Sequence, residues 1–200
     1  MSLHGYTKIL ATHKPGARAL AGHACHVEEK IDGSQFSFGV RGGELMMRSK
    51  RCVINDYEHA QALFKPAVLQ VERMHREGLL VDGWTYRAEA MKGPHHGKLK
   101  YERAPRGNMV LWDVDISCEF YLAPGERADV ADLLGVECVR VFDMVPIYGS
   151  RTSELAKGLL GSPSQLGGQM EGVVFKPVHR APELIRDNKR VVVKYVSDDF

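Results

Sequence analysis

Alternation of apolar and polar residues predicts a chain dominated by β-strands. In the segment 36–40, FSFGV, two phenylalanines alternate with small residues, which is the period of a half-buried strand. Gly42 and Gly43 follow it and predict a hairpin turn, because glycine adopts positive φ easily. Similar patterns predict strands over 36–40, 44–49, 84–91, 109–116, 137–145, 170–178 and 190–196.

Three segments carry helix signals. The first runs from Asp56, a candidate N-cap, to Gly78, a candidate stop, with Pro66 as a break or restart. The others cover 124–135 and 152–160. Strands outnumber helices, and many strands follow one another directly along the chain. This order predicts an α+β fold with antiparallel sheets flanked by helices rather than a doubly wound fold.

Composition narrows the class of protein. The 200 residues, 44% of them hydrophobic and 26% charged, fit one globular domain, and we find no obvious domain boundary. A net charge of +2 gives no global field for nucleic acid, so a polyanion site must be local. The chain lacks a signal peptide and any run of about 18 apolar residues, so we expect no membrane association. The cysteines contain no CxxC pair, which indicates reduced, buried thiols in a cytoplasmic protein; they are Cys25, Cys52, Cys118 and Cys138.

Charged residues interrupt several of the apolar strands. Glu89 stands in the strand 84–91, and Lys194 stands in the strand 190–196. The segment EGVVFK carries Glu171 and Lys176, and strand alternation places Glu171 on the face opposite to Lys176. Charges inside such strands are unusual unless they are paired or functional. A lysine that protects a strand edge is the alternative for any single one of them.

One binding site that contains all of these charged residues would explain why they interrupt the strands. Lys30 lies beside the turn signal Asp32–Gly33, where a polar segment becomes a strand. Lysines neutralise phosphate oxygens, and carboxylates share Mg²⁺ with substrate phosphates. The set of lysines and carboxylates therefore predicts a site for a polyphosphate and a divalent ion.

The four charged segments, in this order, resemble the motifs of the covalent nucleotidyltransferases, which comprise DNA ligases, RNA ligases and capping guanylyltransferases. The match is closer to the phage-type nick-sealing RNA ligases, the second RNA ligase type. It is carried by EEKIDGSQFSF and by the segment 171–200, and it covers about residues 27–200. It implies an ATP-grasp-like nucleotidyltransferase domain over residues 1–200, of phage or bacterial cytoplasmic type. The smaller C-terminal domain of that family is expected to be absent.

The resemblance implies a covalent mechanism. Lys30 would attack the α-phosphate of ATP with Mg²⁺, or with Mn²⁺ in its place, to release pyrophosphate and form lysyl-AMP. The AMP would then pass to a 5′-phosphate, and a 3′-hydroxyl would displace it. The expected partner is nicked or broken RNA, with DNA or an RNA/DNA hybrid left open, and the expected state is a monomer. A DNA ligase, a capping-type guanylyltransferase and a non-catalytic nucleic-acid-binding relative remain alternatives.

The resemblance also implies roles for individual residues. Glu171 and Glu89 are the expected metal-linked carboxylates. Arg51, or else Arg48, is expected to hold a phosphate or ribose, and Leu111 or Trp112 to stack on the base. The full set expected to bind the nucleotide is Glu28, Glu29, Ile31, Asp32, Gly33, Arg48, Arg51, Glu89, Leu111, Trp112, Lys176 and Lys194.

Two positions depart from the resembled pattern, and one loop stands outside it. Asp32 occupies a position where those RNA ligases usually carry His, and Val196 replaces the second lysine of the last motif. The segment 92–103, KGPHHGKLKYER, interleaves Lys, His and Tyr, as loops that follow a nucleic-acid backbone do. A solvated surface loop is the alternative for this segment.

Overall fold

A computed structural model describes residues 3–117, 119–147 and 151–196 of the chain, with Arg151 described only by its backbone. The chain divides into two compact units. The larger unit comprises Met1–Gly5 and Asp32–Val139, and the smaller unit comprises Tyr6–Ile31 and Arg140–Phe200. The chain passes between the units after Gly5, Ile31 and Val139. The second boundary falls inside the Lys30–Gly33 segment and the third inside the predicted strand 137–145, so the sequence pattern shows no division at either.

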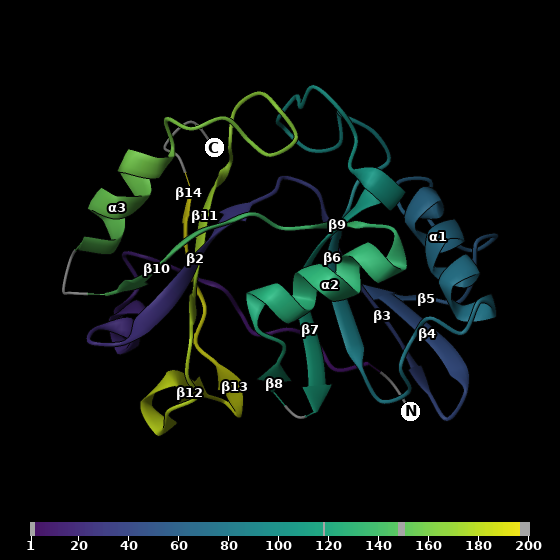
Figure 1. Cartoon of the computed structure of the whole chain (residues 1–200), viewed down its shortest axis with the longest axis horizontal. Coiled ribbons are helices and arrows are strands. Elements are labelled where there is room, and N and C mark those ends of the chain that lie inside the picture. The colour runs from purple at the N-terminus through teal and green to yellow at the C-terminus, as the bar shows by residue number, and fades with distance from the viewer. Residues whose placement is uncertain (1–2, 118, 148–150, 197–200) are drawn as a thin grey trace. The chain divides into compact units, whose positions relative to one another are not determined.

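The smaller unit is built on one sheet with the strand order β1-β14-β11-β2-β10 (Figure 1). Only β1 and β14 pair in parallel among these strands; the other neighbours are antiparallel. One face of the sheet packs into a core around Val27, Val173 and Phe175. The strands are β1 (Leu10–Ala11), β2 (Ala24–Lys30), β10 (Val141–Pro146), β11 (Gly172–Pro177) and β14 (Val193–Val196).

Short elements complete the smaller unit. Helix α3 carries Ala156 and Leu155 onto the core face of the sheet. Its bounds are Arg151–Leu159, and the 3-10 helices are η1 (Pro15–Leu20) and η3 (Pro182–Leu184). A two-stranded hairpin pairs β12 (Ile185–Arg186) with β13 (Lys189–Arg190).

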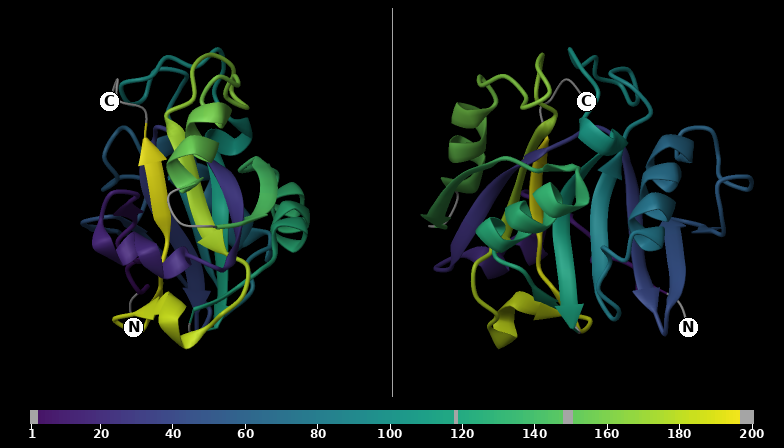
Figure 2. Two further views of the ribbon diagram at one scale, coloured as in Figure 1. Left: turned by 90° about the vertical axis from the view of Figure 1, so that its left-hand side faces the viewer. Right: turned by 45° about the vertical axis from the view of Figure 1, so that its right-hand side comes forward.

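The larger unit is built on a sheet with the order β5-β4-β3-β6-β7-β8, and β9 pairs in parallel with β7. Helices α1 (Lys65–Arg76) and α2 (Pro124–Leu134) cover one face of it (Figure 2). Their apolar residues, such as Val71 and Leu134, pack on Phe36 and Phe38. The other elements are β3 (Ser34–Arg41), β4 (Glu44–Ser49), β5 (Val53–Ile54), β6 (Thr85–Ala90), η2 (Arg106–Asn108), β7 (Met109–Ser117), β8 (Phe120–Tyr121) and β9 (Glu137–Cys138).

Most predicted elements are confirmed, and the antiparallel α+β class is confirmed with them. The first predicted helix is wrong at its start, because α1 begins at Lys65 and not at Asp56. Pro66 lies in the first turn of α1, where its missing N–H costs no hydrogen bond. Asp56 instead accepts the backbone N–H of His59 at 2.9 Å and stabilises a separate turn.

Two predicted strands are each divided in the structure. The segment 137–145 becomes β9 in the larger unit and β10 in the smaller unit. The segment 190–196 becomes β13 and β14, which belong to different sheets. Alternation predicts which residues share a face but not which sheet they join. The alternating pattern therefore continues across both points where the chain leaves one sheet for another.

Among the described residues, no helix is long and apolar enough to cross a membrane. Cys25, Cys52 and Cys138 are free thiols, as predicted, but Cys52 is exposed and Cys138 is half-buried, so of the three only Cys25 is buried as predicted. Cys118 lies outside the described residues. Burial raises the pKa of the Cys25 thiol to about 12, so this cysteine stays protonated in the core.

Replacing Gly172 with alanine should destabilise the smaller unit. A Cβ at Gly172 would lie 2.1 Å from the carbonyl oxygen of Tyr195, which belongs to the neighbouring strand backbone. Such overpacking costs about 2 kcal/mol of unfolding free energy, or roughly 4–8 °C in Tm for a chain of this size. The control is Gly125→Ala in α2, where an added Cβ meets nothing within 4 Å. Equal melting temperatures for the two variants would contradict the close approach of β11 and β14.

Candidate active site

Strand register brings three lysines to one face of the smaller unit's sheet. Gly172 of β11 is opposite Lys30, and Val174 is opposite both Glu28 of β2 and Lys194 of β14. Directly opposed residues of antiparallel strands point to the same side. Lys30, Glu28, Lys176 and Lys194 therefore share the face opposite to the apolar core.

Lys30 ends β2 and makes an ion pair with Glu171. Lys30 Nζ donates to Glu171 Oε2 at 2.7 Å, and the two side chains are 20% and 14% exposed. The sequence-based placement of Glu171 on the face opposite to Lys176 is wrong. Glu171 precedes the first residue of β11, so strand alternation does not constrain its side chain, which turns towards the lysine face.

Lys176 and Glu28 form a second ion pair on the same face. Lys176 Nζ lies 2.5 Å from Glu28 Oε2, and both side chains are almost fully buried. A charge-assisted hydrogen bond of this kind is strong, but each partner depends on the other because neither charge is solvated. The pair is neutral as a whole, and it holds the Lys176 ammonium group in a fixed position on this face of the sheet.

Glu29 lies on the core face and holds a loop. Its buried carboxylate accepts hydrogen bonds from Ser164 Oγ at 2.5 Å and from the Gln165 backbone N–H at 3.0 Å. It also pairs with the Arg140 guanidinium at 2.9 Å. The sequence grouped Glu29 with Glu28 beside the nucleotide, whereas the structure commits its carboxylate to the loop that precedes Glu171.

Asp32 and Gly33 begin the larger unit. The Asp32 carboxylate accepts the Leu99 N–H at 2.8 Å, and the Asp32 N–H donates to Tyr101 Oη at 2.8 Å. A Cβ at Gly33 would lie 2.7 Å from Glu89 Cγ, so glycine is needed for the Glu89 side chain to pack there. The Asp32 carboxylate is thus committed to the loop 92–103 rather than available to the nucleotide.

The two candidate base-stacking residues differ in burial. Leu111 is fully buried and belongs to the core of the larger unit. It is therefore excluded as the stacking residue. The register between β6 and β7 shifts at this point, because Ala88 is opposite Leu111 and Arg87 is opposite Asp113. Trp112 lies in this shift and is only half-buried, so it is the remaining candidate.

The two arginines that are candidates for binding a phosphate or ribose differ in their exposure and their hydrogen bonds. Arg48 donates from Nη1 to the Leu3 carbonyl at 2.9 Å and from Nε to the Ser49 carbonyl at 3.2 Å. These bonds tie the N-terminal segment to β4. Arg51 lies exposed in the turn between Ser49 and Cys52, so its guanidinium is the better placed of the two for a phosphate.

Sequence reasoning missed several buried polar residues. Arg87 is opposite Asp113 across β6 and β7, and its Nη1 donates to Ser37 Oγ at 3.2 Å. Arg127 of α2 donates to the Trp112 carbonyl at 2.8 Å and so supports the strand that carries the candidate stacking residue. A charge inside an apolar strand, the signal used for Glu89, would also have identified Arg87.

The carboxylates fit a metal that arrives with a nucleotide. No group of three or more His, Cys, Asp or Glu side chains in the described part of the chain is arranged to hold a metal ion. Mg²⁺ commonly uses one or two carboxylates together with substrate phosphates and water. Glu171 in the smaller unit and Glu89 in the larger unit each remain candidate carboxylates for such a metal.

This α+β fold, with a lysine and a carboxylate at adjoining strand ends, is the nucleotidyltransferase fold of RNA ligases. The chain belongs to the RNA ligase family, whose family model matches residues 24–196. No curated protein sequence matches it significantly.

Solved structures of one RNA ligase share the fold. An apo form of the Naegleria gruberi RNA ligase superposes with a TM-score of 0.69 at 16% identity. The same ligase with pyrophosphate gives 0.65 at 17% identity, and a variant with ATP and Mn gives 0.69 at 16%. Each match covers 98% of this chain and 56% of the other, so this chain spans just over half the length of that ligase.

Removing Lys176 should destabilise the protein as well as alter its site. Lys176→Ala leaves the buried Glu28 carboxylate without its ion-pair partner, which costs about 3–5 kcal/mol. The double variant Glu28→Gln/Lys176→Met removes both charges and should recover most of this loss. Urea unfolding measures both values, with the exposed Lys157→Ala as the control expected to stay within about 0.5 kcal/mol. A single variant as stable as the control would contradict the buried pair.

Proposed function

We propose that the chain is the catalytic part of an ATP-dependent RNA ligase that forms lysyl-AMP at Lys30. The observation that carries the proposal is the 2.7 Å contact of Lys30 with Glu171 on the face shared with Lys176 and Lys194. The family match over residues 24–196 supports it, because the match includes all four residues.

The first step is attack of the Lys30 amine on the α-phosphorus of ATP. The N–P bond forms as the bond from the α-phosphorus to the bridging oxygen breaks, and pyrophosphate leaves with the electron pair. An ammonium group has no lone pair, so Lys30 must first lose a proton. Glu171 Oε2 already accepts a hydrogen bond from Nζ, and it is the proposed acceptor of that proton.

The proposed role of Lys176 and Lys194 is to stabilise the negative charge of the ATP phosphates. Lys176 is fixed by Glu28 and needs no reorganisation to place its charge, which is the condition for electrostatic stabilisation of a transition state. Lys194 adds a second cation on the same face. Glu171 and Glu89 are each proposed carboxylates for a magnesium ion, which would neutralise further phosphate charge. Trp112, Arg51 and Gly33 are proposed nucleoside contacts.

The later steps act on RNA. The AMP passes from Lys30 to a 5′-phosphate at a break, which frees the lysine and activates that phosphate with a leaving group. A 3′-hydroxyl then attacks the 5′-phosphorus, the new phosphodiester bond forms, and AMP leaves. Both steps need the RNA phosphates to be held by cationic side chains near the site.

The proposal is tested by incubating the protein with α-labelled ATP and Mg²⁺, followed by denaturing electrophoresis. Lys30→Ala should abolish the labelled band. Lys30→Arg should abolish it too, because a guanidinium stays protonated. Glu171→Gln should lower the rate on the order of 10²-fold, the scale of one preorganised electrostatic contact.

Lys157→Ala is the matched control, since Lys157 is an exposed lysine of the same unit and should label at the parental rate. A label that persists in Lys30→Ala would refute Lys30 as the nucleophile. Labelling from GTP instead of ATP would assign the chain to the capping-type alternative.

A further inference from the structure

The loop 92–103 of the larger unit is fastened to the segment that follows Lys30. Asp32 holds it through the Leu99 N–H and Tyr101 Oη, both at 2.8 Å. A second attachment joins Ser34 Oγ to His96 Nε2 at 2.9 Å. These contacts run from His96 to Tyr101, so the loop is fixed at several points along its second half rather than at one point.

The tautomer of His96 follows from its two contacts. Its Nδ1 accepts the Lys92 backbone N–H at 3.2 Å, so the ring proton lies on Nε2 and is donated to Ser34. Burial lowers the pKa of His96, although the nearby Asp32 carboxylate opposes this and Lys92 reinforces it. The neutral ring therefore acts as a structural bridge, and His96 is not one of the loop's cations.

Anchored and exposed residues alternate in the second half of the loop. Leu99 and Tyr101 are buried against the unit, whereas Lys98 and Lys100 are exposed. Two residues of extended chain span at most about 7 Å, so the two ammonium groups lie within reach of neighbouring phosphates on one strand. Lys92 adds a third exposed cation at the start of the loop.

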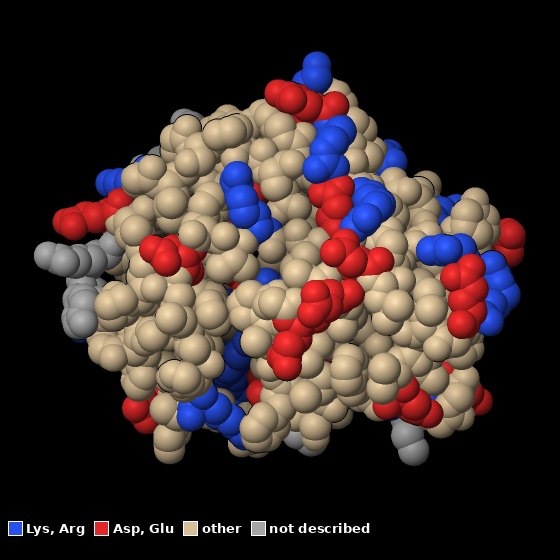
Figure 3. Space-filling view, viewed as in Figure 1, with Lys and Arg blue, Asp and Glu red and all other residues tan. Residues whose placement is uncertain are grey.

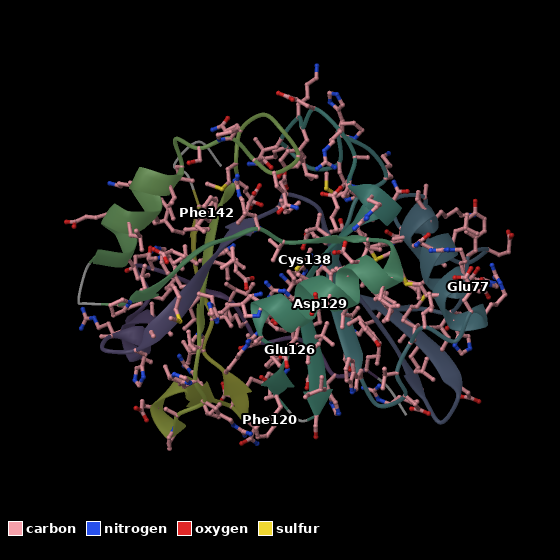
Figure 4. All side chains as sticks on the ribbon, in the orientation of Figure 1. Glu77, Phe120, Glu126, Asp129, Cys138 and Phe142 are labelled. Carbon is pink, nitrogen blue, oxygen red and sulfur yellow. The ribbon has the colours of Figure 1, made fainter. Side chains whose placement is uncertain are left out.

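The surrounding charges distinguish this loop from its neighbours. Arg103, at the end of the segment, donates from Nη2 to the Glu137 carboxylate at 3.0 Å, so the charge of its guanidinium is already neutralised. Helix α2 of the same unit presents acidic side chains, including Glu126 and Asp129 (Figure 4). Figure 3 shows red side chains over that helix, and both blue and red ones on the loop above it, where Glu102 is exposed. Three exposed lysines outweigh this one carboxylate, so a polyanion would be repelled by the helix and attracted by the loop.

We infer that the loop 92–103 is a binding platform for the RNA phosphate backbone, with a shape set by Asp32. Lys98 and Lys100 supply the charge, and the Asp32 anchor presents both on one side. The anchor lies two residues after Lys30 in the chain, so the loop is attached to the same short segment that carries the proposed nucleophile. This inference rests on the proposed function, because it names how the RNA of that reaction is held.

The glycines of the loop provide a matched pair of variants. A Cβ at Gly97 would lie 2.2 Å from Asp32 Oδ1, so Gly97→Ala forces the loop away from its anchor. A Cβ at Gly93, in the same loop, meets nothing within 4 Å, so Gly93→Ala is the control. Lys98→Gln/Lys100→Gln removes the charges and leaves the anchor in place.

The experiment measures binding of a fluorescent nicked RNA duplex over a range of salt concentrations, and self-adenylylation in parallel. The lysine double variant should bind about tenfold more weakly, and the slope of log K against log salt should fall by roughly 1.4–1.8 for two lost phosphate contacts. Gly97→Ala should weaken binding in the same direction, and Gly93→Ala should match the parent. The lysine double variant and Gly93→Ala should self-adenylylate at the parental rate, because that step needs no RNA.

Parental affinity and salt slope in both Gly97→Ala and the lysine double variant would overturn the platform. An equal loss in Gly93→Ala and Gly97→Ala would overturn the Asp32 anchor as its cause. Absence of self-adenylylation in the parent would instead refute the proposed function, so the two failures are distinguishable.

Discussion

The site depends on balancing several positive charges on one face of a small sheet. Lysine ammonium groups in partly or fully buried positions are costly unless each has a counterion. Glu28 supplies a permanent one for Lys176, and the pair is almost fully buried. Glu171 supplies one for Lys30 from outside the strand, and this pair is more exposed, at 20% and 14%. The buried pair therefore fixes the position of one ammonium group, whereas in the more exposed pair a phosphate can replace the carboxylate.

Much of the site could be predicted from the sequence, because strand alternation follows directly from backbone geometry. It correctly places Lys176 away from the apolar core. It fails for Glu171, which lies just outside its strand. The expectation for Glu29 came from the resemblance alone, and the hydrogen bonds of Glu29 reach a loop more than 130 residues away along the chain. Such contacts depend on loop conformation, which no periodic pattern encodes. The choice between Leu111 and Trp112 likewise needed the register shift between β6 and β7.

The division into two units could not be predicted from the sequence, for a related reason. Each unit draws on separated parts of the chain, and the boundary after Ile31 falls within the Lys30–Gly33 motif itself. Composition and turn signals identify linkers between successive domains. They do not identify a short connection by which the chain crosses from one sheet to another. This connection gives the motif two functions, since Lys30 completes the lysine face of one unit while Asp32 anchors the basic loop of the other.

The most direct test of this account locates AMP on the protein itself. The protein is incubated with ATP and Mg²⁺, digested under conditions that preserve a phosphoramidate bond, and analysed by tandem mass spectrometry. The account predicts one adenylylated peptide, modified at Lys30, that disappears when pyrophosphate is added to reverse the step. AMP attached to Lys176 or Lys194, or no adduct on any peptide, would contradict it.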